Sequence, residues 1–172
     1  VATEAVLWMD DGEAVEEATV ACLYRAWARE PDRVLGLDPK TILYDDLKYG
    51  GVDPKDRSYS YVAGKTMLFH HSYLDAYLRD RALVRWVNPE EEETHQGELH
   101  FCEDLALAAL VTHLSGKAPL AVESAGALSA GDAKDGDVWR NKRSRCILWL
   151  EGHFDVMKSP TETRRAVCGA PP

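Results

Sequence analysis

The stretch on which the predicted fold depends is Thr94-His-Gln-Gly-Glu-Leu-His-Phe-Cys-Glu-Asp-Leu-Ala-Leu-Ala-Ala-Leu-Val-Thr-His-Leu-Ser-Gly116. It contains the most apolar run of the chain, Leu105–Val111, together with three of the six histidines and one of the four cysteines. A helix that is apolar on all sides has to be surrounded by other elements. We therefore predict a buried central helix from about residue 97 to Ser115, with Gly116 as its C-terminal cap.

Two further helices are predicted to pack around this one. The first covers residues 12–30, where Asp10 and Glu13 have the spacing of a capping box and apolar residues then recur at helical intervals. The second covers residues 66–81. Residues 82–87 either extend this second helix or form a strand.

Only short strands are expected, from residues 41–62 and 144–151, and the second run is equally compatible with a buried helix. The fold class that follows is mainly α with a few short β-strands, and an α+β arrangement is the alternative.

Length and composition indicate one soluble domain, residues 1–172. Hydrophobic residues make up 45% and charged residues 28% of the chain, which is ordinary for a protein with a packed core. Within the domain we expect an N-terminal arm (1–11), a flexible loop (118–137) and an extended tail (159–172). No apolar run approaches the roughly 18 residues of a membrane-spanning helix, so a transmembrane segment is not expected.

The net charge of -9 opposes binding to nucleic acid and favours a basic protein partner. The chain begins at Val1 and not at Met. Either a targeting peptide has been removed, which would place the protein in an organelle or outside the cell, or the sequence is trimmed.

The four cysteines are dispersed along the chain and contain no Cys-x-x-Cys pair, which excludes a zinc ribbon or a thioredoxin-type motif. Two disulfides with three connectivities are an alternative, but we favour reduced, partly buried thiols. Cys102 lies near the N-terminus of the predicted helix, where a thiolate would be stabilised, yet the residues around it match no protease signature.

One constellation allows a metal-assisted enzyme as an alternative function. Zinc takes three or four nitrogen, sulfur or carboxylate ligands, and residues of these types are available in His70, His71, His100, Cys102 and Asp104. The spacing is against a complete site, because residues two apart such as His100 and Cys102 point to different sides of a helix. We otherwise expect no cofactor.

A glycine-containing tripeptide, Gly64-Lys65-Thr66, resembles the end of a phosphate-binding loop. The position of the required earlier glycine is occupied by Tyr59, so the backbone cradle is missing. We therefore do not assign a phosphate site here.

Aromatic and basic residues in irregular segments predict a surface for protein partners. The predicted contact residues are Tyr44, Tyr49, Tyr59, Tyr61, Trp139, Arg140, Arg143 and Arg145. For the basic members of this set we favour ion pairs within the chain, with the acidic run Glu90–Glu93 as the partner.

A short motif, Leu23-Tyr24-Arg25, resembles the signature of the LYR-motif family of small mitochondrial subunits and assembly factors. The resemblance covers three residues of the first predicted helix and implies a three-helix bundle. We carry over no site residue from that family.

The function we predict from the sequence is a non-catalytic interaction protein, an accessory or assembly subunit that binds other protein subunits of a larger complex. The alternatives are the metal-assisted enzyme and an acidic inhibitor or immunity protein that binds a basic partner.

Overall fold

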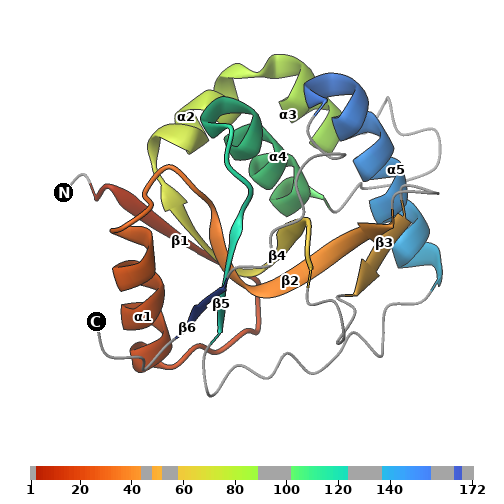
Figure 1. Ribbon diagram of the computed structural model, residues 1–172. Coiled ribbons are helices and arrows are strands. Elements are labelled where there is room, and N and C mark those ends of the chain that lie inside the picture. The colour runs from red at the N-terminus through yellow and green to blue at the C-terminus, as the bar shows by residue number, and fades with distance from the viewer. Residues whose placement is uncertain are drawn as a thin grey trace.

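A mixed β-sheet with helices on both faces forms the body of the protein (Figure 1). The computed structural model describes residues 3–43, 48–51, 58–88, 102–123, 137–155 and 165–167. Among these described residues there are six strands and five helices. None of the described helices combines the length and the apolar character needed to cross a membrane.

The sheet has the strand order β1-β4-β2-β5-β6, and β3 pairs with β2 beside this path. Antiparallel pairs join β4 to β1 and β2, and β2 to β3, whereas β5 is parallel to both β2 and β6. The strands are β1 (Ala5–Met9), β2 (Leu35–Leu43), β3 (Lys48–Gly51), β4 (Tyr61–His70), β5 (Leu120–Glu123) and β6 (Arg165–Val167).

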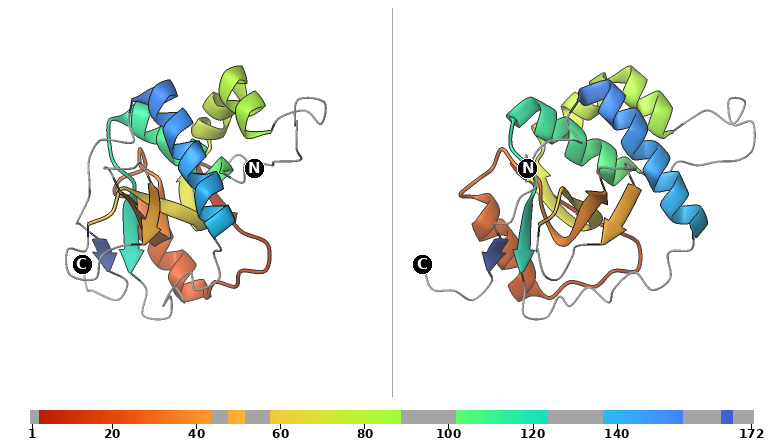
Figure 2. Two further views of the ribbon diagram at one scale, coloured as in Figure 1. Left: turned by 90° about the vertical axis from the view of Figure 1, so that its right-hand side faces the viewer. Right: turned by 45° about the vertical axis from the view of Figure 1, so that its right-hand side comes forward.

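The helices divide between the two faces of the sheet. They are α1 (Glu17–Trp27), α2 (Ser72–Arg79), α3 (Arg81–Val87), α4 (Glu103–Ser115) and α5 (Asp137–Phe154). Figure 2 shows α1 on one side of the sheet and the other four helices together on the opposite side.

Apolar side chains on both faces of the sheet explain why helices cover both faces. Successive side chains of a strand point to opposite faces. Leu35, Leu68 and Leu120 pack against Cys22, Leu23 and Trp27 of α1. Their neighbours Val34, Met67 and Ala121 pack against Leu107 and Val111 of α4.

Helix α4 is the buried element predicted from its composition. The whole of Leu105–Val111 is buried. One side of α4 faces the sheet, and the other packs against Leu83 of α3 and Ile147 of α5. Gly116 caps the helix in the left-handed conformation with φ 68°, so the core helix and its C-terminal cap are confirmed, but the helix begins at Glu103 and not near residue 97.

The prediction of a mainly helical fold is wrong, because the sheet is a full layer of the structure. The largest error concerns the predicted helix over residues 66–81: β4 continues to His70, and only then do α2 and α3 follow. β4 lies between β1 and β2, and helices cover both of its faces. A strand buried on both faces is apolar throughout, and it therefore lacks the period-two pattern that identifies a strand.

Smaller corrections concern boundaries and segments. The first helix begins at Glu17, its N-cap residue Glu16 makes no capping hydrogen bond, and the expected capping box is absent. Residues 144–151 and 82–87 are helical, in α5 and α3. β1, β5 and β6 lie within the segments expected to be an arm, a loop and a tail; residues 124–136 of the loop lie outside the described residues. The LYR tripeptide belongs to α1, which packs on a sheet rather than in a three-helix bundle.

The close contact of β2 with β4 gives a stability prediction. A Cβ atom at Gly36 would lie 2.8 Å from Cβ of Val62 and 3.1 Å from the backbone oxygen of Thr66. We expect Gly36→Ala to lower the free energy of unfolding by about 1–3 kcal/mol, because the sheet has to shift. Urea denaturation measures this.

The matched control is Gly152→Ala in α5, where an added Cβ meets nothing within 4 Å. Alanine is the better helix former, so this change is expected to be neutral or stabilising by up to about 1 kcal/mol. Equal effects of the two substitutions would contradict the packing argument.

Candidate active site

The candidate site lies where β1 ends and α4 begins. The backbone N–H of Asp10, which follows β1, donates to the carbonyl of Lys65 in β4 at 3.1 Å. The backbone N–H of the neighbouring Gly64 donates to Oδ2 of Asp104 at 2.8 Å. The carboxyl end of β1 is thereby connected through β4 to the first turn of α4.

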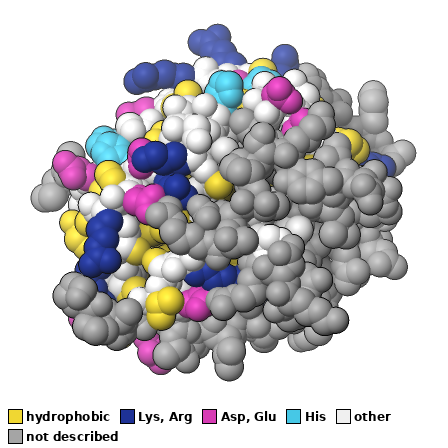
Figure 3. Space-filling view, in the orientation of Figure 1, with side chains coloured by type: hydrophobic (Ala, Val, Ile, Leu, Met, Phe, Trp, Pro, Cys, Tyr) yellow, Lys and Arg dark blue, Asp and Glu magenta, His cyan; other side chains and the backbone are white. Residues whose placement is uncertain are grey.

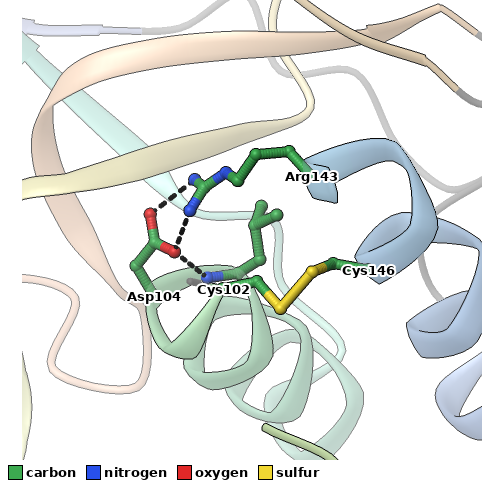
Figure 4. The surroundings of a disulfide bond; sticks show 5 residues. Cys102, Asp104, Arg143 and Cys146 are labelled. Carbon is green, nitrogen blue, oxygen red and sulfur yellow. Dashed lines mark hydrogen bonds and ion pairs between the residues drawn. A yellow bond between two sulfur atoms is a disulfide. The ribbon is translucent and has the colours of Figure 1, made fainter. Parts of the chain in front are cut away.

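Both carboxylate oxygens of Asp104 accept hydrogen bonds from neighbouring groups. Its Oδ1 accepts from Nη1 of Arg143 at 2.6 Å and from the backbone N–H of Leu105 at 2.7 Å, and its Oδ2 also accepts from Nη2 of Arg143 at 2.7 Å (Figure 4). Asp104 is 6% exposed and Arg143 4%. Such a two-bond, charge-assisted pair holds the carboxylate in one orientation.

Only glycine can stand opposite Asp104 on β4. A Cβ atom at Gly64 would lie 2.6 Å from Cβ of Asp104 and 3.0 Å from its Oδ2. The strand backbone therefore approaches the carboxylate closely enough to donate a hydrogen bond. This contact explains Gly64, which we had left unassigned.

Asp10 belongs to the same electrostatic neighbourhood. Burial raises the pKa of Asp10 above its ordinary value, and the carboxylate of Asp104 contributes to this rise, whereas a hydrogen bond with Trp8 and the guanidinium of Arg143 oppose it. Asp11 follows Asp10, and Gly12 then turns the chain with φ 85°. Two acidic residues thus follow β1, and the first of them, Asp10, interacts electrostatically with both Asp104 and Arg143.

A disulfide joins the two helices that carry the pair. Cys102, immediately before α4, is bonded to Cys146 of α5, and 44 residues separate them in the sequence. Closing a loop of this length stabilises a fold by about 4 kcal/mol in the chain-entropy model. Cys22 of α1 is disulfide-bonded as well. The prediction of reduced thiols is therefore wrong; nothing local in the sequence indicated the pairing.

The residues predicted as a zinc site are placed in different regions. Cys102 is in the disulfide and Asp104 is paired with Arg143. His70 and His71 stack on each other with ring centroids 4.6 Å apart. His70 lies six positions further along β4, or about 20 Å of strand, from Gly64, which contacts Asp104.

Within the described part of the chain, no group of three or more His, Cys, Asp or Glu side chains is arranged to hold a metal ion. His100 lies outside the described residues, so its role as a metal ligand stays a prediction.

Several residues predicted to bind partners are internal. Tyr59 and Tyr61 are buried, and the hydroxyl of Tyr59 accepts a hydrogen bond from the backbone N–H of Ala121 at 2.9 Å. Arg143 is the buried partner of Asp104, whereas Arg145 is exposed. On the face in Figure 3, basic and acidic side chains are interspersed over the described residues.

The other predicted partner contacts are not described at the level of side chains. Tyr44 lies outside the described residues, and Tyr49, Trp139 and Arg140 are placed only as members of β3 and α5. Their role in binding a partner stays a prediction.

The sequence contained one usable signal for this site. An apolar run, Ala5–Met9, is followed directly by two acids, Asp10 and Asp11. Acidic side chains at the carboxyl end of a strand are a common arrangement in binding sites of α/β folds. The prediction of Asp10 as a helix cap is wrong, because α1 begins only at Glu17. The ion pair within the chain that was favoured for the basic residues is confirmed for Arg143, although its partner is Asp104 and not the acidic run 90–93.

Comparison with known proteins identifies the class. Residues 1–165 match the model of the glycosyl transferase family 64 domain. This match covers nearly the whole chain, and the chain therefore belongs to the glycosyl transferase family 64.

Three curated proteins illustrate the relationship. The chain is 27% identical over 125 residues to the Exostosin-like-3 homolog of Caenorhabditis elegans, covering 72% of this chain and 14% of that protein. It is 26% identical over 124 residues to Exostosin-1 of Drosophila melanogaster, covering 71% and 15%. It is 25% identical over 126 residues to Exostosin-like 2 of Mus musculus, covering 68% and 36%. The chain thus spans about a seventh to a third of the length of these relatives.

Family membership overturns the predicted function. The family indicates a glycosyltransferase, so the prediction of a non-catalytic accessory or complex-assembly subunit is wrong. The prediction of a helical protein is wrong because the fold contains a full β-sheet. Motifs of residues close together in the sequence do not mark this site. Asp104 and Arg143 are 39 residues apart and meet only in the folded chain.

Burial of the pair leads to a stability prediction. Arg143→Met keeps most of the side-chain length but leaves the charge of Asp104 buried without its partner. The expected loss in the free energy of unfolding, measured by urea denaturation, is about 3–5 kcal/mol.

Lys117→Met is the matched control. Lys117 pairs with Asp32, and both of these side chains are 43% exposed. Exposed pairs contribute at most about 1 kcal/mol. A cost for Arg143→Met no greater than that for Lys117→Met would refute the importance of the buried pair.

Proposed function

We propose that this chain carries the active site of a glycosyltransferase that moves a sugar from a phosphate-activated donor to a hydroxyl group of an acceptor. In this reaction the bond between the anomeric carbon and the phosphate oxygen breaks, a new bond to the acceptor oxygen forms, and the hydroxyl proton is released. The observation that carries the proposal is the oriented carboxylate of Asp104 beside Asp10, at the end of β1. Membership of the family supports it.

Asp104 is suited to stabilise positive charge on the sugar. Transfer at an anomeric carbon passes through a transition state with oxocarbenium character. A carboxylate that is already fixed by four hydrogen bonds, from Gly64, Leu105 and Arg143, does not have to reorient as that charge develops. In this scheme Arg143 holds Asp104 in place, because both of its terminal nitrogens are bonded to that carboxylate.

The acids at the end of β1 fit a divalent cation that is shared with the donor. Mg²⁺-type ions are commonly held by one or two carboxylates together with substrate phosphates, rather than by a cage of protein ligands. Asp10 and Asp11 provide two exposed carboxylates, and the described residues contain no larger cluster of ligands. When bound, the cation would neutralise charge on the phosphate leaving group.

Asp10 itself is predisposed to such a role. Its raised pKa reflects partial burial and the neighbouring negative charge of Asp104, which both disfavour the charged carboxylate, and a bound cation would favour that charged form again. The two carboxylates then have different partners: Asp104 has Arg143, and Asp10 has the cation.

The test uses a panel of nucleotide sugars with and without Mg²⁺ or Mn²⁺, and it measures release of the nucleotide. We expect cation-dependent release by the wild type. Asp10→Asn is expected to lose about 100-fold or more in kcat/KM, since it removes charge stabilisation in the site.

Asp75→Asn is the control. Asp75 is an exposed acid of α2, so its replacement is expected to leave turnover unchanged. If no donor releases its nucleotide, or if Asp10→Asn and Asp75→Asn behave alike, the proposed function is wrong.

A further inference from the structure

The Cys102–Cys146 disulfide adjoins the Asp104–Arg143 pair on both sides. Cys102 lies two residues before Asp104, and Cys146 lies three residues after Arg143, which is one turn further along α5. Figure 4 shows the two side-chain bridges next to each other between α4 and α5. Both cysteines are fully buried. The covalent link is therefore about one helical turn from the ion pair.

The two helices also share apolar contacts. Leu105, Ala106 and Ala109 of α4 share an apolar cluster with Ile147 and Leu150 of α5. Apolar contact is non-directional, so it favours burial without selecting one position of α5 along α4. The guanidinium of Arg143 stands at the end of a long side chain, so the ion pair by itself leaves α5 some freedom to shift, at the cost of the pair's geometry.

The N-cap position of α4 is held by the disulfide and not by a capping hydrogen bond. Cys102 is the N-cap residue and makes no side-chain capping hydrogen bond. A serine, threonine or aspartate at this position would usually hold the first turn by such a bond. In this protein the side chain of the N-cap residue forms a disulfide with α5 instead, and the Cα atoms of the two cysteines are 6.4 Å apart.

We infer that the Cys102–Cys146 disulfide is a positioning element of the active site: it fixes α5 against the first turn of α4 so that Arg143 holds Asp104 in its productive orientation. The activity part of this inference rests on the proposed function. Active sites require their groups to be held within about 0.5 Å of the productive geometry, a precision that apolar helix packing alone does not give. Sugar transfer by this chain accordingly depends on conditions in which the disulfide stays oxidised.

The first test compares two disulfide variants of the full chain. Cys102→Ala/Cys146→Ala removes the link beside the site, and Cys22→Ala removes the one on the opposite face of the sheet. Both are expected to lower the unfolding temperature. Below that temperature, kcat of the double variant is expected to fall about 10- to 100-fold, the usual cost of a misplacement near 1 Å, with KM for the donor nearly unchanged. Cys22→Ala should keep the wild-type kcat.

The second test does not require activity. A double-mutant cycle with Asp104→Asn and Arg143→Gln measures the coupling between the two residues from urea unfolding, with and without the Cys102–Cys146 bond. We expect the coupling to fall by at least half when the bond is absent. Sucrose, which favours the folded state, keeps weakly stable variants measurable.

The outcomes separate this inference from the proposed function. An unchanged coupling, or an equal loss of kcat in both disulfide variants, overturns the positioning role. If the wild type transfers no sugar but the coupling still depends on the disulfide, the proposed function fails and the positioning of the pair stands.

Discussion

The buried ion pair of Asp104 and Arg143 is the interaction on which the arrangement of the site depends. A carboxylate and a guanidinium that are removed from water each lose several kcal/mol of hydration, and they regain it only through close, well-oriented hydrogen bonds. This requirement brings α5 to the first turn of α4. It also brings the backbone of β4 so close to Asp104 that only glycine fits at position 64.

The apolar framework places these groups at one end of the sheet. Helix α4 is buried between the sheet and the α3–α5 layer, so its N-terminus can open only at an edge of the sheet. At that edge β1 ends in Asp10 and Asp11, and β4 passes between β1 and β2. Polar residues therefore gather at the strand end, whereas the middle of the sheet is covered on both faces. The pKa of Asp10 is raised first by its partial burial at this edge and then by the neighbouring carboxylate of Asp104.

The two disulfide-bonded regions lie on opposite faces of the same sheet. Cys22 belongs to the cluster under α1, and Cys102 and Cys146 belong to the cluster between α4 and α5. From the sequence we expected free thiols, since dispersed cysteines have no local pattern that distinguishes a bridge from a buried thiol. Composition does not reveal the sheet either. Met67–Phe69 is apolar because both faces of β4 are covered, and the same residues suit a buried helix. Asp10 was misread for a related reason, because an acid before a helix and an acid at the end of a strand look alike when the strand is short.

The sequence alone determined that Leu105–Val111 is a buried helix and that Gly116 ends it. Both depend on local properties: an all-round apolar surface that must leave water, and a backbone conformation with positive φ that glycine adopts without strain. The tertiary structure decided the sheet, the site and the disulfide. Arg143 reaches Asp104 across 39 residues and Cys146 reaches Cys102 across 44, and such meetings are set by the path of the whole chain. Side-chain periodicity extends over a few turns, so it can describe the core helix but cannot show which distant residues will meet at its end.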